Sequence, residues 1–139
     1  KPQEVYDNPA NLFVARFLGT PPINVFDGEI KGSKLYIGQD AVLDIKGSAD
    51  REVHVGIRPE GFVLKEDGPL CCQLSGVEVM GRDISVVSTH AASLNPTVRS
   101  IIGTDNRVDG SQEKVRFALL PRKVFLFDKQ TQERIDFDV

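Results

Sequence analysis

Apolar and polar side chains alternate along most of this chain, which is the pattern of strands that bury one face. The alternation begins at Asn24, and residues 25–30 and 34–37 flank the turn residues 31–33, so we predict a hairpin there. Ser75-Gly76 predicts a bend within a long strand. The other runs with this pattern predict strands over residues 43–45, 52–57, 62–64, 70–80, 83–89, 114–120, 123–128 and 134–137.

Residues 1–19 have a different pattern, with apolar side chains at helical spacing. Asn8 is a good N-cap, Pro9 suits the first helical position and Gly19 suits the position after the last turn. We therefore predict a short N-terminal helical segment, which ends before the connector at Pro21-Pro22. Its apolar stripe needs something to pack against, either a neighbouring domain or the rest of this chain.

About eight short strands, with turn residues roughly every 8–12 positions, predict a barrel or a sandwich. No predicted helix alternates with the strands, which disfavours a parallel sheet. Residues 95–112 are polar and rich in Gly, Asp and Asn, and we predict that most of this segment is a mobile loop. The predicted fold class is all-β, with a helical end and linker over residues 1–22 and a barrel over residues 23–139.

The composition narrows the range of functions. The chain has 139 residues, and its 17 Lys and Arg against 20 Asp and Glu give a net charge of −3. Because there is no basic block, this charge argues against generic binding to nucleic acid phosphates. No apolar run approaches the roughly 18 residues of a membrane span. The chain opens at Lys1 with neither a Met nor a secretion signal, so we expect it to be an excerpt of a longer protein.

No pattern in the chain predicts catalytic, cofactor or metal chemistry. The nearest approach to a phosphate-binding loop, from Gly28 to Lys34, has Ser and Lys in the wrong order and lies in a predicted hairpin. His54 and His90 have no second ligand at metal spacing, and we interpret His54 as an imidazole on the sheet surface. We interpret the acidic residues of the turns as isolated charges; they are Asp40, Asp44, Glu66 and Asp67.

Two pairs of side chains are interpreted as structural. Cys71 and Cys72 alternate across a predicted strand, one facing inward and one outward, so we expect thiols rather than a disulfide. Phe125 and Phe127 share one face of another predicted strand. Such a pair can stack nucleobases in barrels that bind single strands, but the acidic balance of the chain favours a role in the core.

Three segments, in order, resemble the C-terminal region of the ATP-binding subunits of bacterial carbohydrate importers. Residues 2–19 (PQEVYDNPANLFVARFLG) resemble the end of the nucleotide-binding domain in the maltose and multiple-sugar importer family. Residues 55–60 (VGIRPE) match a segment of the regulatory domain that follows it. Residues 124–128 (VFLFD), followed by Thr131 and Arg134-Ile135, resemble the closing strand pair of that domain. The resemblance covers nearly the whole chain except residues 95–112.

The resemblance implies an OB-like, transport-associated (TOBE) barrel with a regulatory and dimerisation role in an importer of the maltose, multiple-sugar or glycerol-3-phosphate type. It implies three partners: a second copy of the chain, membrane-spanning permease subunits and a regulator protein, with no nucleic acid. ATP and Mg²⁺ are expected only in the parent protein, an ABC transport ATPase whose motifs lie upstream, and no enzymatic activity is expected of this fragment. The expected location is cytoplasmic, at the inner face of the cell membrane.

Two motifs supply the candidate interface or regulatory residues, which are Arg58, Pro59, Glu60, Gly81 and Arg82. Pro59 ends a predicted strand, and the flanking Arg58 and Glu60 either pair with each other, cap nearby backbone or contact another subunit. Gly81 follows a strand with an acidic end, where the family usually has Leu-Gly and this chain has Met-Gly. The resemblance therefore carries a departure at this position.

Two other functions remain open at this point. Related domains in molybdate importers bind oxyanions through Ser, Lys and backbone N–H groups, so the first alternative is an oxyanion-binding or other small-ligand-binding barrel. The VGIRPE segment favours the sugar branch over this alternative. The second is a stand-alone barrel that binds oligonucleotides, which the net negative charge disfavours.

Overall fold

The computed structural model describes residues 11, 22–103, 106 and 108–139. The helical segment predicted over residues 1–19 therefore lies outside the described residues, apart from Asn11. Most of the first predicted part, residues 1–22, lies outside them as well. The division at residue 22 stays a prediction.

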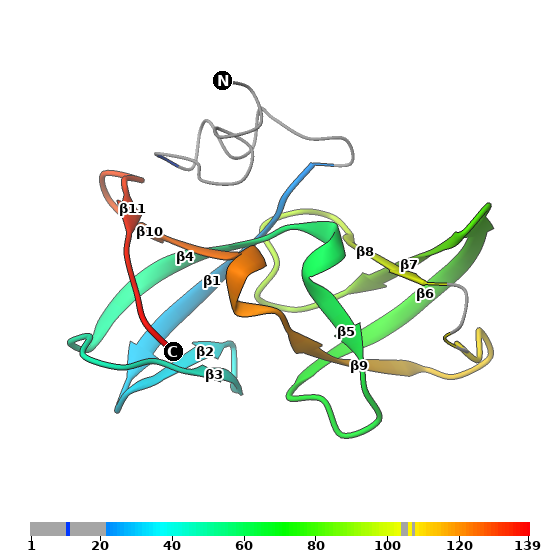
Figure 1. Ribbon diagram of the computed structural model, residues 1–139, viewed down its shortest axis with the longest axis horizontal. Helices are drawn as coiled ribbons and strands as arrows, with labels where there is room; N and C mark the ends of the chain where they lie inside the picture. Colours follow the sequence, from blue (N-terminus) through cyan, green and yellow to red (C-terminus); the bar gives the residue numbers. More distant parts are fainter. Residues whose placement is uncertain (1–10, 12–21, 104–105, 107) are drawn as a thin grey trace.

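The described chain is nearly all β and its strands form two antiparallel sheets (Figure 1). Sheet 1 has six strands in the order β11 (Arg134–Ile135), β10 (Val124–Asp128), β4 (Arg51–Ile57), β1 (Asn24–Lys31), β2 (Lys34–Ile37) and β3 (Asp40–Asp44). Sheet 2 has five strands in the order β5 (Phe62–Leu64), β9 (Lys114–Leu119), β6 (Leu70–Met80), β7 (Asp83–Thr89) and β8 (Val98–Gly103). Two short 3-10 turns, η1 (Pro59–Gly61) and η2 (Pro121–Lys123), complete the elements.

Sheet 2 curls until its two ends meet, because β8 at one end also lies beside β5 at the other. This nearly closed sheet confirms the predicted all-β, OB-like barrel of short antiparallel strands. The predicted hairpin is confirmed as β1 and β2, and its turn places Gly32 and Ser33 at φ of 58° and 62°. The predicted bend in β6 is a register shift between Leu74 and Gly76.

The prediction of a mobile loop over residues 95–112 is wrong for its first half. Residues 98–103 form β8, which pairs with β7 along its whole length. Val98, Ser100 and Ile102 are buried, so the segment has the alternation of a strand. The signal was obscured because a Ser occupies the central inward position and Gly, Asp and Asn residues follow directly.

Two segments of the chain pass from one sheet to the other and run antiparallel to each other as they do so. β4 leads through η1 into β5, and β9 leads through η2 into β10; β4 pairs with β10 while β5 pairs with β9. Each segment has a proline, Pro59 or Pro121, as the first residue of its turn. Because proline lacks an N–H and fixes φ, each ladder ends there and the strand changes sheet. We call residues 57–62 and 119–124 the sheet crossing.

The core lies between the two sheets and inside the curled sheet. Phe125 and Phe127 are 7% and 0% exposed, which confirms their predicted role in the core. Within the described residues, no helix has the length and hydropathy needed to cross a bilayer. The largest fully buried apolar side chains are Phe26, Phe117, Phe127, Ile23, Ile30, Leu35, Ile37, Ile45, Ile57 and Leu70.

Candidate functional site

The sheet crossing holds three of the candidate residues. Backbone hydrogen bonds join its two segments: the Arg58 N–H donates to the Lys123 carbonyl at 3.1 Å, and the Leu120 N–H donates to the Gly61 carbonyl at 2.8 Å. The Glu60 carboxylate lies 3.9 Å from the Lys123 ammonium. The motif that suggested a local turn therefore ties η1 to η2.

Arg58 is the largest fully buried side chain in the described chain, with 1% of its surface exposed. Its guanidinium carbon lies 5.8 Å from the centre of the Phe125 ring, within the range of a cation–π contact. Burying a guanidinium is costly unless its charge is compensated, so this residue belongs to the internal structure of the sheet crossing.

Gly81 and Arg82 form the two-residue turn between β6 and β7. Gly81 has a φ of 61°, a value that glycine adopts without strain and that suits the first position of a tight hairpin turn. The two residues before it, Val79 and Met80, are 70% and 57% exposed. We call residues 79–82 the hairpin tip.

The structure separates the two groups of candidate residues. In Figure 1 the hairpin tip lies at the right-hand end of the molecule, whereas η1 lies near its centre. The five residues therefore do not form one site. Arg58, Pro59 and Glu60 belong to the sheet crossing, whereas Gly81 and Arg82 follow the two most exposed large apolar side chains of the described surface, Val79 and Met80.

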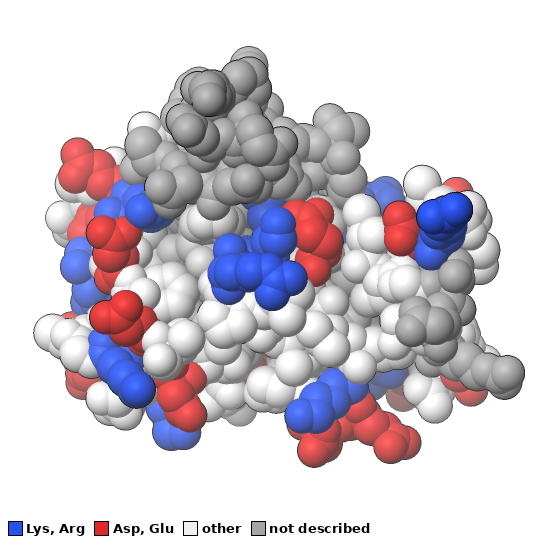
Figure 2. Space-filling model, in the orientation of Figure 1, with Lys and Arg blue, Asp and Glu red and all other residues white. Residues whose placement is uncertain are grey.

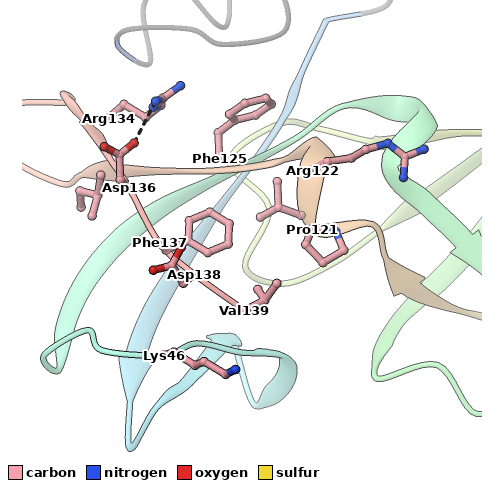
Figure 3. Close-up of a pocket in the computed structure, with 11 residues that line it drawn as sticks. Lys46, Pro121, Arg122, Phe125, Arg134, Asp136, Phe137, Asp138 and Val139 are labelled. Carbon is pink, nitrogen blue, oxygen red and sulfur yellow. Dashed lines mark hydrogen bonds and ion pairs between the residues drawn. The ribbon is translucent and has the colours of Figure 1, made fainter.

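A groove lies on the opposite side of η2 from sheet 2, and sequence reasoning did not find it. It has a volume of about 950 Å³ and is lined by residues of β10 and η2, by Lys46, and by residues 134–139. Figure 3 shows Phe137 and Val139 along one wall, Pro121 across from them and Lys46 at the lower end. We call this cavity the C-terminal groove. No sequence signal marks it, because Lys46 is about seventy-five residues away in the chain from the other lining residues, which lie within 121–139.

Asp40 is not an isolated charge, and this corrects the sequence interpretation. Its carboxylate accepts a hydrogen bond from the Cys71 backbone N–H at 3.2 Å and lies 3.2 Å from His90 Nε2. The Ala92 N–H donates to His90 Nδ1 at 3.0 Å, which places the imidazole proton of a neutral ring on Nε2, toward Asp40. The cluster joins β3 of sheet 1 to β6 and to the segment after β7, so it fastens the two sheets together.

The cysteines follow the predicted alternation. Cys72 is buried and Cys71 is partly exposed, and both are free thiols. Burial raises the pKa of Cys72 to about 12, so its thiol stays protonated at neutral pH. His54 is largely buried, with Nε2 3.5 Å from the Asp27 carboxylate, so it packs deeper than a surface imidazole.

Two observations bear on metal and nucleic acid binding, one on the described residues and one on the face shown in Figure 2. No group of three or more His, Cys, Asp or Glu among the described residues is arranged to hold a metal ion. On the face in Figure 2, basic and acidic side chains are interspersed around a field of uncharged surface. Such a mixed surface is unlike the continuous basic track that binds a phosphate backbone.

Comparison with known proteins places this fold and its motifs in a family. No known family profile matches the chain. The chain is 33% identical over 141 residues to the sn-glycerol-3-phosphate import ATP-binding protein UgpC of Ruegeria sp. (strain TM1040), covering 96% of this chain and 38% of that protein. It is 32% identical over 149 residues to the sulfoquinovosyl glycerol transport ATP-binding protein SmoE of Agrobacterium fabrum (strain C58 / ATCC 33970), covering 96% and 39%.

The fold and these matches define the chain as an OB-like part of an ABC importer ATP-binding protein. Within that class, the chain corresponds to the C-terminal part of the UgpC-type sugar importer ATP-binding proteins. The chain spans about 38% of the length of the first curated relatives that it matches. The relatives confirm the resemblance to the C-terminal region of importer ATP-binding subunits.

Proposed function

We propose that this chain is the regulatory and dimerisation domain of the ATP-binding subunit of a sugar ABC importer. The pattern of coverage carries the proposal: relatives named as import ATP-binding proteins match 96% of this chain over only 38% of their own length. In this proposal ATP and Mg²⁺ act in the rest of the parent protein, and the chain itself neither binds nor hydrolyses ATP. The 139-residue chain is expected to give no heat of binding with Mg-ATP in calorimetry.

The hairpin tip is the surface that we assign to pairing with a second copy. Val79 and Met80 are the two most exposed large apolar residues of the described chain. Full burial of such a side chain stabilises an interface by about 1.5–3 kcal/mol. Gly81 shapes the turn and Arg82 adds a charge beside the apolar pair. Arg58, Pro59 and Glu60 then act indirectly, because they hold the sheet crossing.

The parent protein is proposed to work with membrane-spanning permease subunits at the cytoplasmic face of the cell membrane, and to receive a regulator protein. The relatives are named for glycerol-3-phosphate and sulfoquinovosyl glycerol transport. We therefore propose a glycerol- or sugar-derived solute for the parent importer. Mechanically, paired barrels hold two ATP-binding subunits together while those subunits open and close, and an effector biases one of the two states.

Sedimentation velocity of the full-length parent protein tests the pairing. Met80→Gln is expected to shift the population from dimer toward monomer, because it removes apolar area from the proposed contact. The matched control is Leu94→Gln, since Leu94 is 43% exposed but lies away from the hairpin tip, between β7 and β8. If both variants sediment like the wild type, or both dissociate equally, the tip is not the pairing surface.

A further inference from the structure

We propose that the C-terminal groove binds a small amphipathic anion, meaning an organic molecule with a flat apolar body and one carboxylate, sulfonate or phosphate group. The groove's volume of about 950 Å³ lies within the range of roughly 300–1,000 Å³ that is typical of small-molecule sites. The inference concerns binding by this chain itself. Its regulatory meaning, described below, rests on the proposed function.

The walls of the groove favour a flat apolar body. Phe137 and Ile135 are half-buried and pack against the core, so each keeps an exposed face toward the groove. Pro121 stands across from Phe137 in Figure 3. An aromatic ring between a phenylalanine and a proline gains apolar burial and ring contact together.

The charges around the groove favour one anionic group. Arg134 is already paired, because its guanidinium lies 2.8 Å from the Asp136 carboxylate. Lys46 and Arg122 also line the groove, and neither forms an ion pair within the described part of the chain. Asp138 is the remaining acidic side chain of the lining, and in the 139-residue chain the terminal carboxylate of Val139 offsets the remaining positive charge, so anion binding depends on Lys46 and Arg122 themselves and not on the net charge of the groove. Both basic side chains are exposed and have long stems. In Figure 3 the Arg122 side chain extends away from Phe137, so it reaches the mouth of the groove only after a change of rotamer.

The groove is held open by backbone contacts at both ends of its outer wall. At one end β11 pairs with β10, with Ile135 opposite Leu126. At the other end the Lys46 N–H donates to the Asp138 carbonyl at 2.8 Å. A wall fixed at both ends needs little reordering when a ligand enters, and this lowers the entropic cost of binding.

The same wall connects the groove to the start of the chain. Glu133, which directly precedes β11, pairs with Asn11 in an isolated β-bridge. A ligand that contacts residues 134–138 therefore touches β11. Glu133, the residue next to β11, pairs with Asn11 in the segment that precedes the barrel. If the proposed function holds, that segment leads to the ATP-binding part of the parent, and the ligand regulates import through it.

Fluorescence titration of the 139-residue chain with 1-anilinonaphthalene-8-sulfonate tests the site. The probe is an aromatic monoanion, and the chain has no Trp to interfere with its signal. Saturable binding to one site is expected, with displacement by phenyl phosphate, benzenesulfonate and benzoate. Phenol and inorganic phosphate, each lacking one half of the ligand chemistry, are expected to compete at least tenfold less well. The three competing anions compare phosphate, sulfonate and carboxylate head groups directly.

Substitutions locate the site. Lys46→Met and Arg122→Met are each expected to weaken probe binding several-fold, and the double variant at least tenfold. Lys114→Met is the matched control, since Lys114 is an exposed lysine on sheet 2 that lines a different cavity. Backbone amide shifts in NMR spectra are expected for residues 134–139 and not for the β6–β7 hairpin. Thermal melts of every variant confirm that folding is intact.

Several results would overturn the proposal. They are non-saturable binding, equal competition by phenol, unchanged affinity in the double variant, or amide shifts away from the groove. These measurements use the isolated chain, so their failure leaves the pairing test of the parent protein untouched. Conversely, the groove can bind the anion even if the hairpin tip does not pair. That result would overturn the proposed function and the regulatory role of the ligand, but not the binding site itself.

Discussion

Replacing Asn24 tests whether a single amide holds the two sheets together. Its side chain is 3% exposed and reaches from β1 in sheet 1 to β8 in sheet 2. Nδ2 donates to the Ile57 carbonyl at 3.1 Å and to the Arg99 carbonyl at 2.9 Å, while Oδ1 accepts from the Arg99 N–H at 2.9 Å. The amide therefore hydrogen-bonds both the N–H and the carbonyl of Arg99, as the backbone of a neighbouring strand would. It does so on the side of β8 that does not face β7.

The expected cost follows from those three hydrogen bonds. Asn24→Ala leaves the N–H and the carbonyl of Arg99 without this partner, and each buried polar group left unsatisfied costs about 1–3 kcal/mol. Because the hydrogen bonds to Arg99 are only partly buried, we expect a loss of about 2–4 kcal/mol in the free energy of unfolding. For a domain of this size the melting temperature falls about 3–5 °C per kcal/mol, so a decrease of roughly 6–20 °C is expected.

The assay is urea denaturation of the 139-residue chain followed by circular dichroism. Asn24→Asp is the sharper variant: it keeps the acceptor for the Arg99 N–H but sets a carboxylate against two carbonyls. Its pKa is expected to be raised, so its stability should recover as pH falls and the protonated acid donates one hydrogen bond. Gln112→Ala, at an exposed position, is the surface control. If Asn24→Ala unfolds within about 0.5 kcal/mol of the wild type, the amide is not a strut between the sheets.

Three further predictions concern single residues. In the native chain, Ellman's reagent is expected to modify Cys71 much faster than Cys72, whose thiol is buried and has its pKa raised to about 12. Backbone N–H groups, first that of Thr131, lower the pKa of Asp128, so this group stabilises the fold above its unfolded pKa near 3.8 and loses that effect as pH falls through the lower, folded value. Asp128→Asn is therefore expected to flatten the acid limb of stability against pH. Gly68→Ala is expected to destabilise the chain by more than about 2 kcal/mol, because its Cβ would lie 2.5 Å from a carbonyl oxygen of β9.

Each of these predictions has its control and its contradiction. The fully denatured chain must react with two equivalents of Ellman's reagent. Equal rates of modification of Cys71 and Cys72 in the native chain would contradict the burial of Cys72. Acid unfolding of the Asp67→Asn variant controls for the loss of a surface charge, since Asp67 is exposed; equal flattening would contradict a specific role for Asp128. Gly110→Ala controls for a change in backbone entropy, because nothing lies within 4 Å of its Cβ. Equal stability of the two alanine variants would contradict the close approach at Gly68.

Period-two alternation was a sufficient guide wherever a strand buries a clear apolar face. The observed bounds of β6 (Leu70–Met80) and β7 (Asp83–Thr89) coincide with the predicted runs. It was insufficient for β8, because Ser100 fills an inward position that the pattern expects to be apolar. Local patterns also carry no information on which strand changes sheet, since that depends on partners about seventy residues away.

The candidate site residues also differ in how far the sequence alone predicted their structural role. The turn at Gly81 was predictable, since a strand end followed by glycine is a local signal. The burial of Arg58 was not, because it depends on the second segment of the sheet crossing packing against the first. The contact between Asp40 and His90 joins residues fifty positions apart and has no local trace. The family resemblance supplied the class of protein, which periodicity alone did not.

The sheet crossing also constrains the order in which the chain can fold. β4 forms ladders with β1, which precedes it closely, and with β10, which follows it by about seventy residues. During synthesis, one edge of β4 therefore stays without its native partner until nearly the whole barrel has left the ribosome. An uncovered strand edge of this kind is an aggregation risk, and contacts of long sequence separation form slowly. The yield of folded protein should consequently depend on how quickly residues 110–139 are made, or on how well the open edge of β4 is protected until they arrive.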